Sequence, residues 1–194
     1  MKPIVLASSS PRRRRLLREL GVGFSVRVPD LDERPLPGEL PGPHVRRLAL
    51  AKARAVAREL APECGAQWVL GADTVVVLDG KILGKPRDAR EARGMLARLS
   101  GRTHEVLTGV ALVPAAGGRA RTAVVRSRVE MKPFDKATIR RYVAGGEPLD
   151  KAGAYAVQGR GRHLVARVSG SLTNVVGLPL ERLRQLLTDV GVLP

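Results

Sequence analysis

A run of hydroxyl and guanidinium side chains near the start of the chain has the chemistry of a phosphate site. It reads SSSPRR at residues 8–13 and follows the apolar stretch 3–7. Where a strand ends and a helix begins, backbone N–H groups and the helix dipole attract anions, and arginine forks bind phosphate oxygens in pairs. The run therefore predicts an anion site; the alternative is an ordinary helix cap followed by a solvated basic face.

An acid interrupts the most apolar segment of the sequence. Asp73 lies within VLGADTVVV, and the earlier loop 30–43 carries Asp30, Asp32 and Glu33. Because burial of a lone carboxylate is costly, we expect Asp73 to be paired, metal-bound or at a cleft edge. Mg²⁺ prefers carboxylate oxygens together with substrate phosphates, so one loop acid with Asp73 would suit it. The alternatives are backbone donors satisfying Asp73 and a solvated acidic loop.

Two later segments offer further polar groups. Lys85 lies in LGKP, but the GxxxxGK[ST] spacing of a P-loop is absent, so Lys85 is either a site residue returning toward Asp73 or a surface lysine. The segment 150–161, DKAGAYAVQGRG, combines flexible glycines with Gln158. A glutamine amide supplies both a donor and an acceptor for a base edge, whereas the alternative is an ordinary turn between strands.

The remaining reactive residue types predict no site. His44, His104 and His163 lack metal-ligand spacing and are expected to be structural or exposed, and no Ser-His-Asp order or HExxH motif is present. The single cysteine, Cys64, excludes a disulfide within the chain. We expect Cys64 to be a half-buried small apolar residue.

Periodicity and capping signals predict alternating strands and helices. The pattern favours a mixed α/β sheet over a purely parallel one, because two hairpin-like pairs accompany the alternation. Lys52 falls inside one predicted helix, and Asp79-Gly80 is a hairpin turn signal. The expected strands are 3–7, 23–29, 67–78, 81–86, 103–113, 120–132 and 163–168, and the expected helices are 11–20, 44–60, 88–99, 135–142 and one after Pro179.

Length and composition narrow the class of protein. A chain of 194 residues, 44% of them hydrophobic, fits one compact domain or two small lobes around a cleft. It has no run of 18 apolar residues and no secretory signal order, so we expect a cytoplasmic protein. A net charge of +16 favours anionic partners. With only 3% aromatic residues, stacking of single-stranded nucleic acid is not indicated.

Taken together, these segments resemble the Maf family of nucleotide pyrophosphatases. The resemblance rests on the loop that carries Glu33 and on five stretches in the expected order, LASSSPRRRRLLRELG, LALAKA, LGADTVVVLDGKILGKPRDAREARGMLARLSGRTHEVLTGVAL, EPLDKAGAYAVQGRG and NVVGLPLERL. It implies a single two-lobed domain over 1–194 with the α/β fold of inosine triphosphate pyrophosphatases, a central active-site cleft, a divalent cation (Mg²⁺ or Mn²⁺) and a homodimer.

The resemblance also implies roles for individual residues. Asp73 matches the catalytic proton acceptor and, with Glu33, the metal site. The positions that line the phosphates match Ser8, Arg13, Lys52 and Lys85, and those associated with base choice match Arg12, Thr74 and Gln158. The text SPRR and DKAGAYAVQG resembles the branch that hydrolyses dTTP and UTP.

Two rival functions stay open at this point. One is a 7-methyl-GTP pyrophosphatase of the same family, which changes the substrate and keeps the chemistry. The other is a non-enzymatic basic protein that binds nucleic acid or regulates division. The second rival gives no reason for an acid inside an apolar strand.

Overall fold

The computed structural model describes residues 4–60 and 67–194, so Cys64 lies outside the described residues. The chain forms a mixed sheet in the order β2-β1-β3-β5-β6-β7, with β4 beside β3. The strands are β1 (Ile4–Ala7), β2 (Phe24–Arg27), β3 (Trp68–Leu78), β4 (Lys81–Leu83), β5 (Thr103–Pro114), β6 (Arg121–Met131) and β7 (Val165–Ser169). The α-helices are α1 (Pro11–Glu19), α2 (Pro41–Leu60), α3 (Ala89–Leu99), α4 (Lys136–Ala144), α5 (Leu172–Val176) and α6 (Leu180–Asp189), and the 3₁₀ helices are η1 (Glu147–Asp150), η2 (Ala152–Ala154) and η3 (Gly159–Leu164).

Strand directions confirm the mixed α/β class. β1 runs parallel to both of its neighbours, with Ile4 opposite Phe24 of β2 and Trp68 of β3. β4 pairs with β3 and β7 with β6 in antiparallel fashion. The β3–β4 turn has positive φ at Asp79 (51°) and Gly80 (73°). These angles suit the tight hairpin turn that the Asp-Gly signal predicted.

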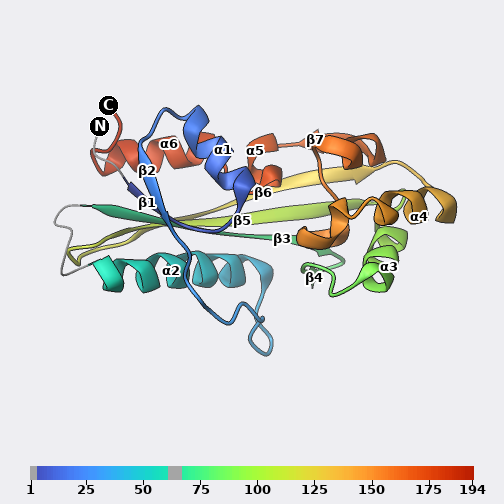
Figure 1. Ribbon diagram of the computed structural model, residues 1–194, viewed down its shortest axis with the longest axis horizontal. Coiled ribbons are helices and arrows are strands. Elements are labelled where there is room, and N and C mark those ends of the chain that lie inside the picture. Colours follow the sequence, from blue (N-terminus) through green and yellow to red (C-terminus); the bar gives the residue numbers. More distant parts are fainter. Residues whose placement is uncertain (1–3, 61–66) are drawn as a thin grey trace. The chain divides into compact units, whose positions relative to one another are not determined.

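The described residues group into two compact units. Unit 1 comprises residues up to Asp73, Thr108–Val125 and Gly177–Pro194, and unit 2 comprises Thr74–Leu107 and Arg126–Val176. Within unit 1, α2 covers one face of the strands while α1 and α6 cover the opposite face (Figure 1). Within unit 2, α3 and α4 pack on an apolar core that includes Leu96, Met131 and Tyr155.

Helix α2 approaches the sheet of unit 1 closely because two strand positions lack a side chain. A Cβ built on Gly71 of β3 would lie 2.1 Å from the Ala49 carbonyl oxygen, and one on Gly109 of β5 would lie 2.2 Å from the Val45 carbonyl oxygen. Glycine within a strand commonly marks such a close backbone approach. The rest of this interface is small and apolar, with Ala49, Ala53 and Val56 facing β-strand residues of the same core.

Helix starts follow the expected capping chemistry. Ser10, Asp88 and Asp135 each accept a hydrogen bond from the backbone N–H three residues later, at the starts of α1, α3 and α4. The two largest differences between predicted and observed boundaries are in α2 and β4. Helix α2 begins at Pro41 rather than residue 44, because prolines are tolerated in a first helical turn. The strand predicted at 81–86 is only three residues long.

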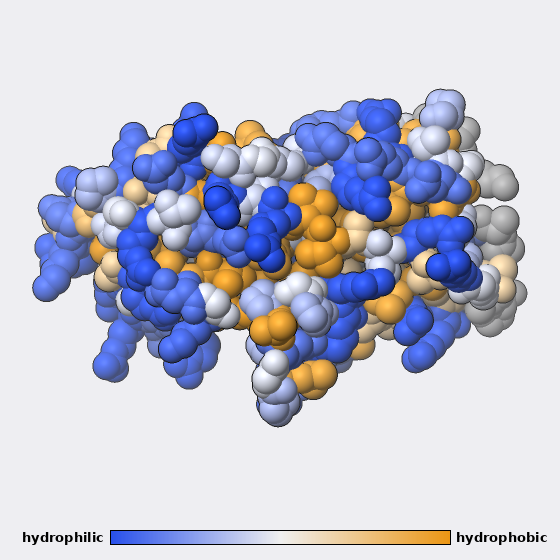
Figure 2. All heavy atoms as spheres, turned by 180° about the vertical axis from the view of Figure 1, so that it is seen from behind, coloured by the Kyte–Doolittle hydropathy of each residue, from blue (hydrophilic) through white to orange (hydrophobic). Residues whose placement is uncertain are grey.

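The face in Figure 2 is mostly hydrophilic, with smaller hydrophobic areas between the polar side chains. Across residues 4–60 and 67–194, no helix combines the length and the apolar character needed to cross a membrane.

Candidate active site

The parallel strands β1 and β2 both end in unit 1 close to the level at which β3 reaches Asp73, in the middle of that strand. Ala7, the last residue of β1, pairs with Gly71 of β3. Ser8 therefore follows β1 one residue short of the level of Asp73 on β3. The loop that carries Glu33 leaves the same edge after β2, which also ends beside Ala7. Such edges are the usual ligand sites of open α/β sheets.

A buried hydroxyl organises the start of α1. Ser8 is 7% exposed, and its Oγ accepts hydrogen bonds from the backbone N–H of Ser10 (3.2 Å) and from Nη1 of Arg13 (3.2 Å). Ser10 Oγ in turn accepts the Arg13 N–H at 3.4 Å. The serine run thus caps the helix and orients an arginine, which confirms the helix cap, while the anion site stays a prediction.

Arg13 is also held from the far end of the sequence. Its Nε donates to the Gly177 carbonyl oxygen at 2.9 Å, and Gly177 has a φ of +120°. A φ of that kind strains any residue with a side chain. Sequence reasoning missed this contact, although Gly177 lies within the stretch NVVGLPLERL.

Lys52 lies between two carboxylates. Its Nζ is 2.7 Å from Oδ1 of Asp73 and 2.7 Å from Oε1 of Glu33. Asp73 and Lys52 are buried at 6% and 7% exposure, whereas the Glu33 side chain is half exposed. The expectation that Asp73 is paired is confirmed.

The close packing of α2 explains how Lys52 reaches Asp73. Residues two apart on a strand face the same side, so Asp73 faces α2 as Gly71 does. Gly71 meets Ala49 and Ala53, and Lys52 lies between these two on the helix. A glycine two residues before a buried acid in a strand was the sequence signal for this arrangement.

The charges of this cluster act on one another. Burial lowers the pKa of Arg13, while the carboxylates of Asp73 and Glu33 oppose that shift and Arg12 adds to it. A guanidinium stays protonated despite such a shift. The cluster consequently presents fixed positive charge beside two acids, as a site for a metal–phosphate substrate requires.

Asp32 and Glu39 of the acidic loop each bind a different arginine. Asp32 binds Arg34 through both oxygens, and this hydrogen bonding lowers the Asp32 pKa to about 2. Glu39 accepts from Arg47 and from the Leu36 N–H and contacts His44. Asp30 is exposed. Of the three acids considered from sequence, Glu33 is therefore the one that lies beside Lys52 and Asp73.

The donor set fits a divalent cation of the magnesium type. Two carboxylate oxygens converge on one position, where the Lys52 ammonium lies 2.7 Å from each. Among the residues that the structure describes, no group of three or more His, Cys, Asp or Glu side chains is placed to bind a metal. Mg²⁺ commonly takes only one or two carboxylates and completes its shell with water and substrate phosphate, so a metal held by Glu33 and Asp73 stays a prediction.

The other predicted site residues are distributed differently. Arg12 is half-buried on α1 in unit 1. Thr74, Lys85 and Gln158 belong to unit 2. Thr74 is half-buried on β3, while Lys85, after β4, and Gln158, before η3, are exposed. The structure thus brings together Ser8, Arg13, Glu33, Lys52 and Asp73.

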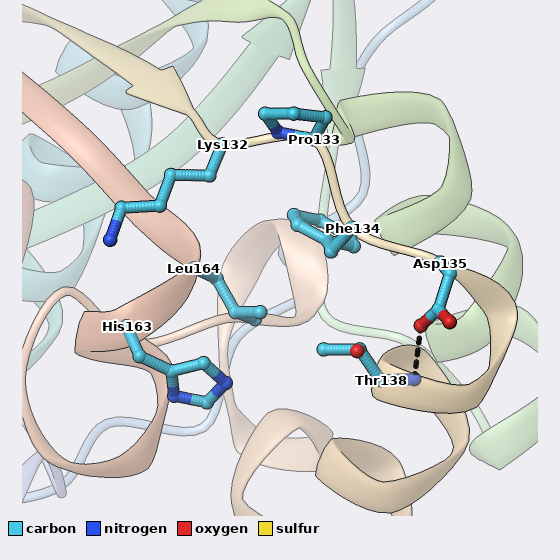
Figure 3. A pocket seen from close by; sticks show the side chains of 7 residues that line it. All are labelled: Lys132, Pro133, Phe134, Asp135, Thr138, His163 and Leu164. Carbon is cyan, nitrogen blue, oxygen red and sulfur yellow. Dashed lines mark hydrogen bonds between the residues drawn. The ribbon is translucent and has the colours of Figure 1, made fainter.

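Unit 2 also contains an open pocket of about 360 Å³ at the start of α4 (Figure 3). The side chains of Phe134 and Leu164 line it, and Lys132 and His163 lie beside them. Asp135 is occupied by the helix-capping hydrogen bond from the Thr138 N–H, 2.8 Å long. The predicted site residues do not line this pocket, so the pocket is not part of the candidate active site.

The sequence matches one family model and is similar to proteins that bear one name. A model described as "Maf-like protein" matches residues 3–190. The chain is 52% identical over 191 residues to a dTTP/UTP pyrophosphatase of Symbiobacterium thermophilum, covering 98% of this chain and 95% of that protein. It is 53% identical over 189 residues to a dTTP/UTP pyrophosphatase of Myxococcus xanthus, covering 97% and 93%.

A solved HAM1 protein from Coxiella burnetii has a similar fold, with a TM-score of 0.57 at 19% identity over 97% of this chain and 100% of that one. This likeness supports the predicted fold class independently of the family match. Since the family model runs through all the segments described above, the chain belongs to the Maf family.

Proposed function

We propose that the chain is a nucleoside triphosphate pyrophosphatase that hydrolyses dTTP and UTP to the monophosphate and pyrophosphate. The relatives at 52% and 53% identity bear that name over nearly their full length. The observation that carries the proposal is the buried Asp73 carboxylate, paired with Lys52 beside Glu33 and near enough to Arg13 to influence its pKa.

In the proposed reaction, Asp73 acts as general base. Water attacks the α-phosphorus, the bond from that phosphorus to the bridging oxygen breaks, and pyrophosphate leaves in line. Asp73 takes the proton from the attacking water. A carboxylate offers about four acceptor positions, so pairing of Oδ1 with Lys52 leaves capacity to orient that water. Positioned proton transfer of this kind contributes about 10² to 10⁴ in rate.

The other residues bind and orient the substrate in this proposal. Arg13 and Lys52 contact the β- and γ-phosphates, with Ser8 holding Arg13 in place. The family resemblance assigns Lys85 to the phosphates as well, and Arg12, Thr74 and Gln158 to the base. Glu33 and Asp73 would hold Mg²⁺ or Mn²⁺, which would neutralise the charge that develops on the phosphate oxygens.

The proposal extends to assembly and location. As the family resemblance implies, the enzyme acts as a homodimer. It works in the cytoplasm, where nucleoside triphosphates are available. Size measurement by light scattering on the purified protein tests the first statement, and fractionation of expressing cells tests the second.

Pyrophosphate release from purified protein tests the function. We would supply Mg²⁺ or Mn²⁺ with dTTP, UTP, CTP, ATP, GTP or 7-methyl-GTP, and use Asp73→Asn as the inactive control. The proposal expects release from dTTP and UTP that the variant lacks. Preference for 7-methyl-GTP would keep the chemistry and overturn the base assignment. A folded protein that releases no pyrophosphate, yet binds DNA or RNA with steep salt dependence, would overturn the enzymatic proposal.

A further inference from the structure

The turn formed by residues 156–161 is fixed through its backbone by two side chains of unit 2. Oε1 of Glu147 accepts the Arg160 N–H at 3.1 Å, and Oε2 accepts the Gly161 N–H at 2.9 Å. The hydroxyl of Tyr142 accepts the Ala156 N–H at 3.1 Å. One carboxylate and one phenol therefore hold both ends of the turn. Hydrogen bonds to an ionised carboxylate are about twice as strong as neutral ones.

The glycines of this turn fit against these side chains with no room for a methyl group. At Gly159, where φ is +68°, a Cβ would lie 2.4 Å from Oε1 of Glu147. At Gly161 it would lie 2.3 Å from the Ala156 carbonyl oxygen and 2.7 Å from the Tyr142 hydroxyl. The close fit restricts the turn to the backbone path that the two anchors define.

A buried contact holds the chain just before the turn. Tyr155 is 5% exposed and His104 is 2% exposed, and the Tyr155 hydroxyl is 2.8 Å from Nε2 of His104. Their rings also meet edge to face, with centroids 5.2 Å apart. Residues 155–161 are consequently anchored before the turn and at both of its ends.

Gln158 is presented from the middle of this anchored segment. Its side chain is exposed, and its backbone is extended, with φ −117° and ψ 167°. It lies two residues from both the Ala156 and the Arg160 anchor points. An amide on a fixed backbone can select between hydrogen-bond patterns of bases, because a misaligned base leaves a polar group unpaired.

We propose that Glu147 is a positioning residue for substrate choice: its carboxylate fixes the 156–161 turn and thereby sets the orientation in which Gln158 meets a pyrimidine base. The identity of the ligand rests on the proposed function. Glu147 itself touches the backbone of Arg160 and Gly161, so its effect on the base passes through the turn.

The test uses Glu147→Ala and Glu147→Gln in the full-length protein, with Glu130→Gln on the exposed surface of β6 as a matched control. Three measurements are compared: amide hydrogen exchange over 156–161, affinity for an α,β-imido analogue of dUTP by calorimetry, and kcat and KM for dTTP and GTP. The glutamine variant keeps one carboxamide oxygen as acceptor and guards against a failure of the alanine variant to fold.

For Glu147→Ala we expect exchange in the turn to accelerate about tenfold and KM for dTTP to rise about tenfold, with kcat within about twofold. Analogue affinity should fall by the same factor as KM rises, and the preference for dTTP over GTP should shrink. Glu147→Gln should lie between wild type and Glu147→Ala.

Two results would overturn the inference: unchanged exchange in the turn, or faster exchange with unchanged affinity and base preference. Failure of the proposed function looks different. In that case the wild-type protein hydrolyses no nucleotide at all. If that protein still binds the analogue, the binding and exchange measurements decide the role of Glu147 without turnover.

Discussion

The charged cluster of unit 1 and the anchored turn of unit 2 are held in place by different kinds of contact. In the cluster, formed by Ser8, Arg13, Glu33, Lys52 and Asp73, side chains of opposite charge hold one another. In the turn, side chains hold backbone N–H groups. The cluster therefore depends on its balance of charge, while the turn depends on the path of its backbone. The difference predicts that charge changes affect turnover in the first region and that backbone changes affect selectivity in the second.

Neutralising the acid of the cluster is the largest expected effect. Asp73→Asn keeps the shape and removes the proton acceptor that we propose, so kcat should fall by about 10² to 10⁴. The measurement is steady-state pyrophosphate release, with circular dichroism to verify folding. Asp30→Asn, an exposed acid of the preceding loop, is the matched control and should retain wild-type kcat. Near-normal kcat in Asp73→Asn would show that another group accepts the proton.

Removing the counter-ion should destabilise the cluster. Lys52→Met leaves the buried Asp73 beside Glu33 without the ammonium 2.7 Å from each, and breaking a buried ion pair from one side costs about 3–5 kcal/mol. Urea unfolding at pH 7 measures this loss. Lys81→Met on β4, an exposed lysine, should change stability little. An equally small change for Lys52→Met would mean that solvent screens the acids of the cluster.

A methyl group under α2 tests whether the cluster depends on its scaffold. Gly71→Ala would place a Cβ 2.1 Å from the Ala49 carbonyl oxygen, so α2 must shift. Overpacking of this kind costs about 1–3 kcal/mol, and the shift should also move Lys52 away from Asp73. Gly94→Ala, where a Cβ meets nothing within 4 Å, is the control. The free energy of unfolding and kcat are measured on the same samples. A loss of stability with full kcat would show that the cluster does not depend on the close packing of α2.

Lowering the pH should destabilise the folded protein through the buried His104 ring. Burial lowers the pKa of His104 from 6.5 to about 4, so the native state binds fewer protons than the unfolded state between these values. The stabilisation is complete above pH 6.5 and is lost as the pH falls toward 4. We expect about 2 kcal/mol less stability from this group at pH 5 than at pH 7. Urea unfolding at both values should show a smaller pH difference in His104→Gln.

Local chemistry made the elements of the fold predictable. Ser10, Asp88 and Asp135 signalled helix starts, and Asp79-Gly80 signalled the hairpin, because caps and tight turns depend on a few neighbouring residues. The position of β4 was correct but its length was not, since pairing with β3 limits it to three residues. No local signal predicts the short helices around residues 147–164, where the chain follows its tertiary contacts.

The sequence indicated those site residues whose type is unusual for the segment in which they lie. An acid in an apolar strand had to find a partner, and Asp73 has Lys52. The identity of that partner depends on the approach of α2, for which Gly71 was a signal that pattern reasoning did not use. The contacts of Gly177 and Glu147 join backbone atoms to distant side chains. Every residue type has these backbone atoms, so the sequence does not indicate such contacts.

The hydrogen bond from Arg13 to Gly177 can form only late in the synthesis of the chain. These residues are 164 positions apart, and a ribosome that adds about 5–20 residues per second needs roughly 8–33 s to cover that distance. During this interval the serine run and Lys52 already exist, but Arg13 lacks its carbonyl acceptor. The charged cluster is therefore among the last parts of the protein to be completed, and a nascent chain released before residue 177 would carry most of the motifs without the finished cluster.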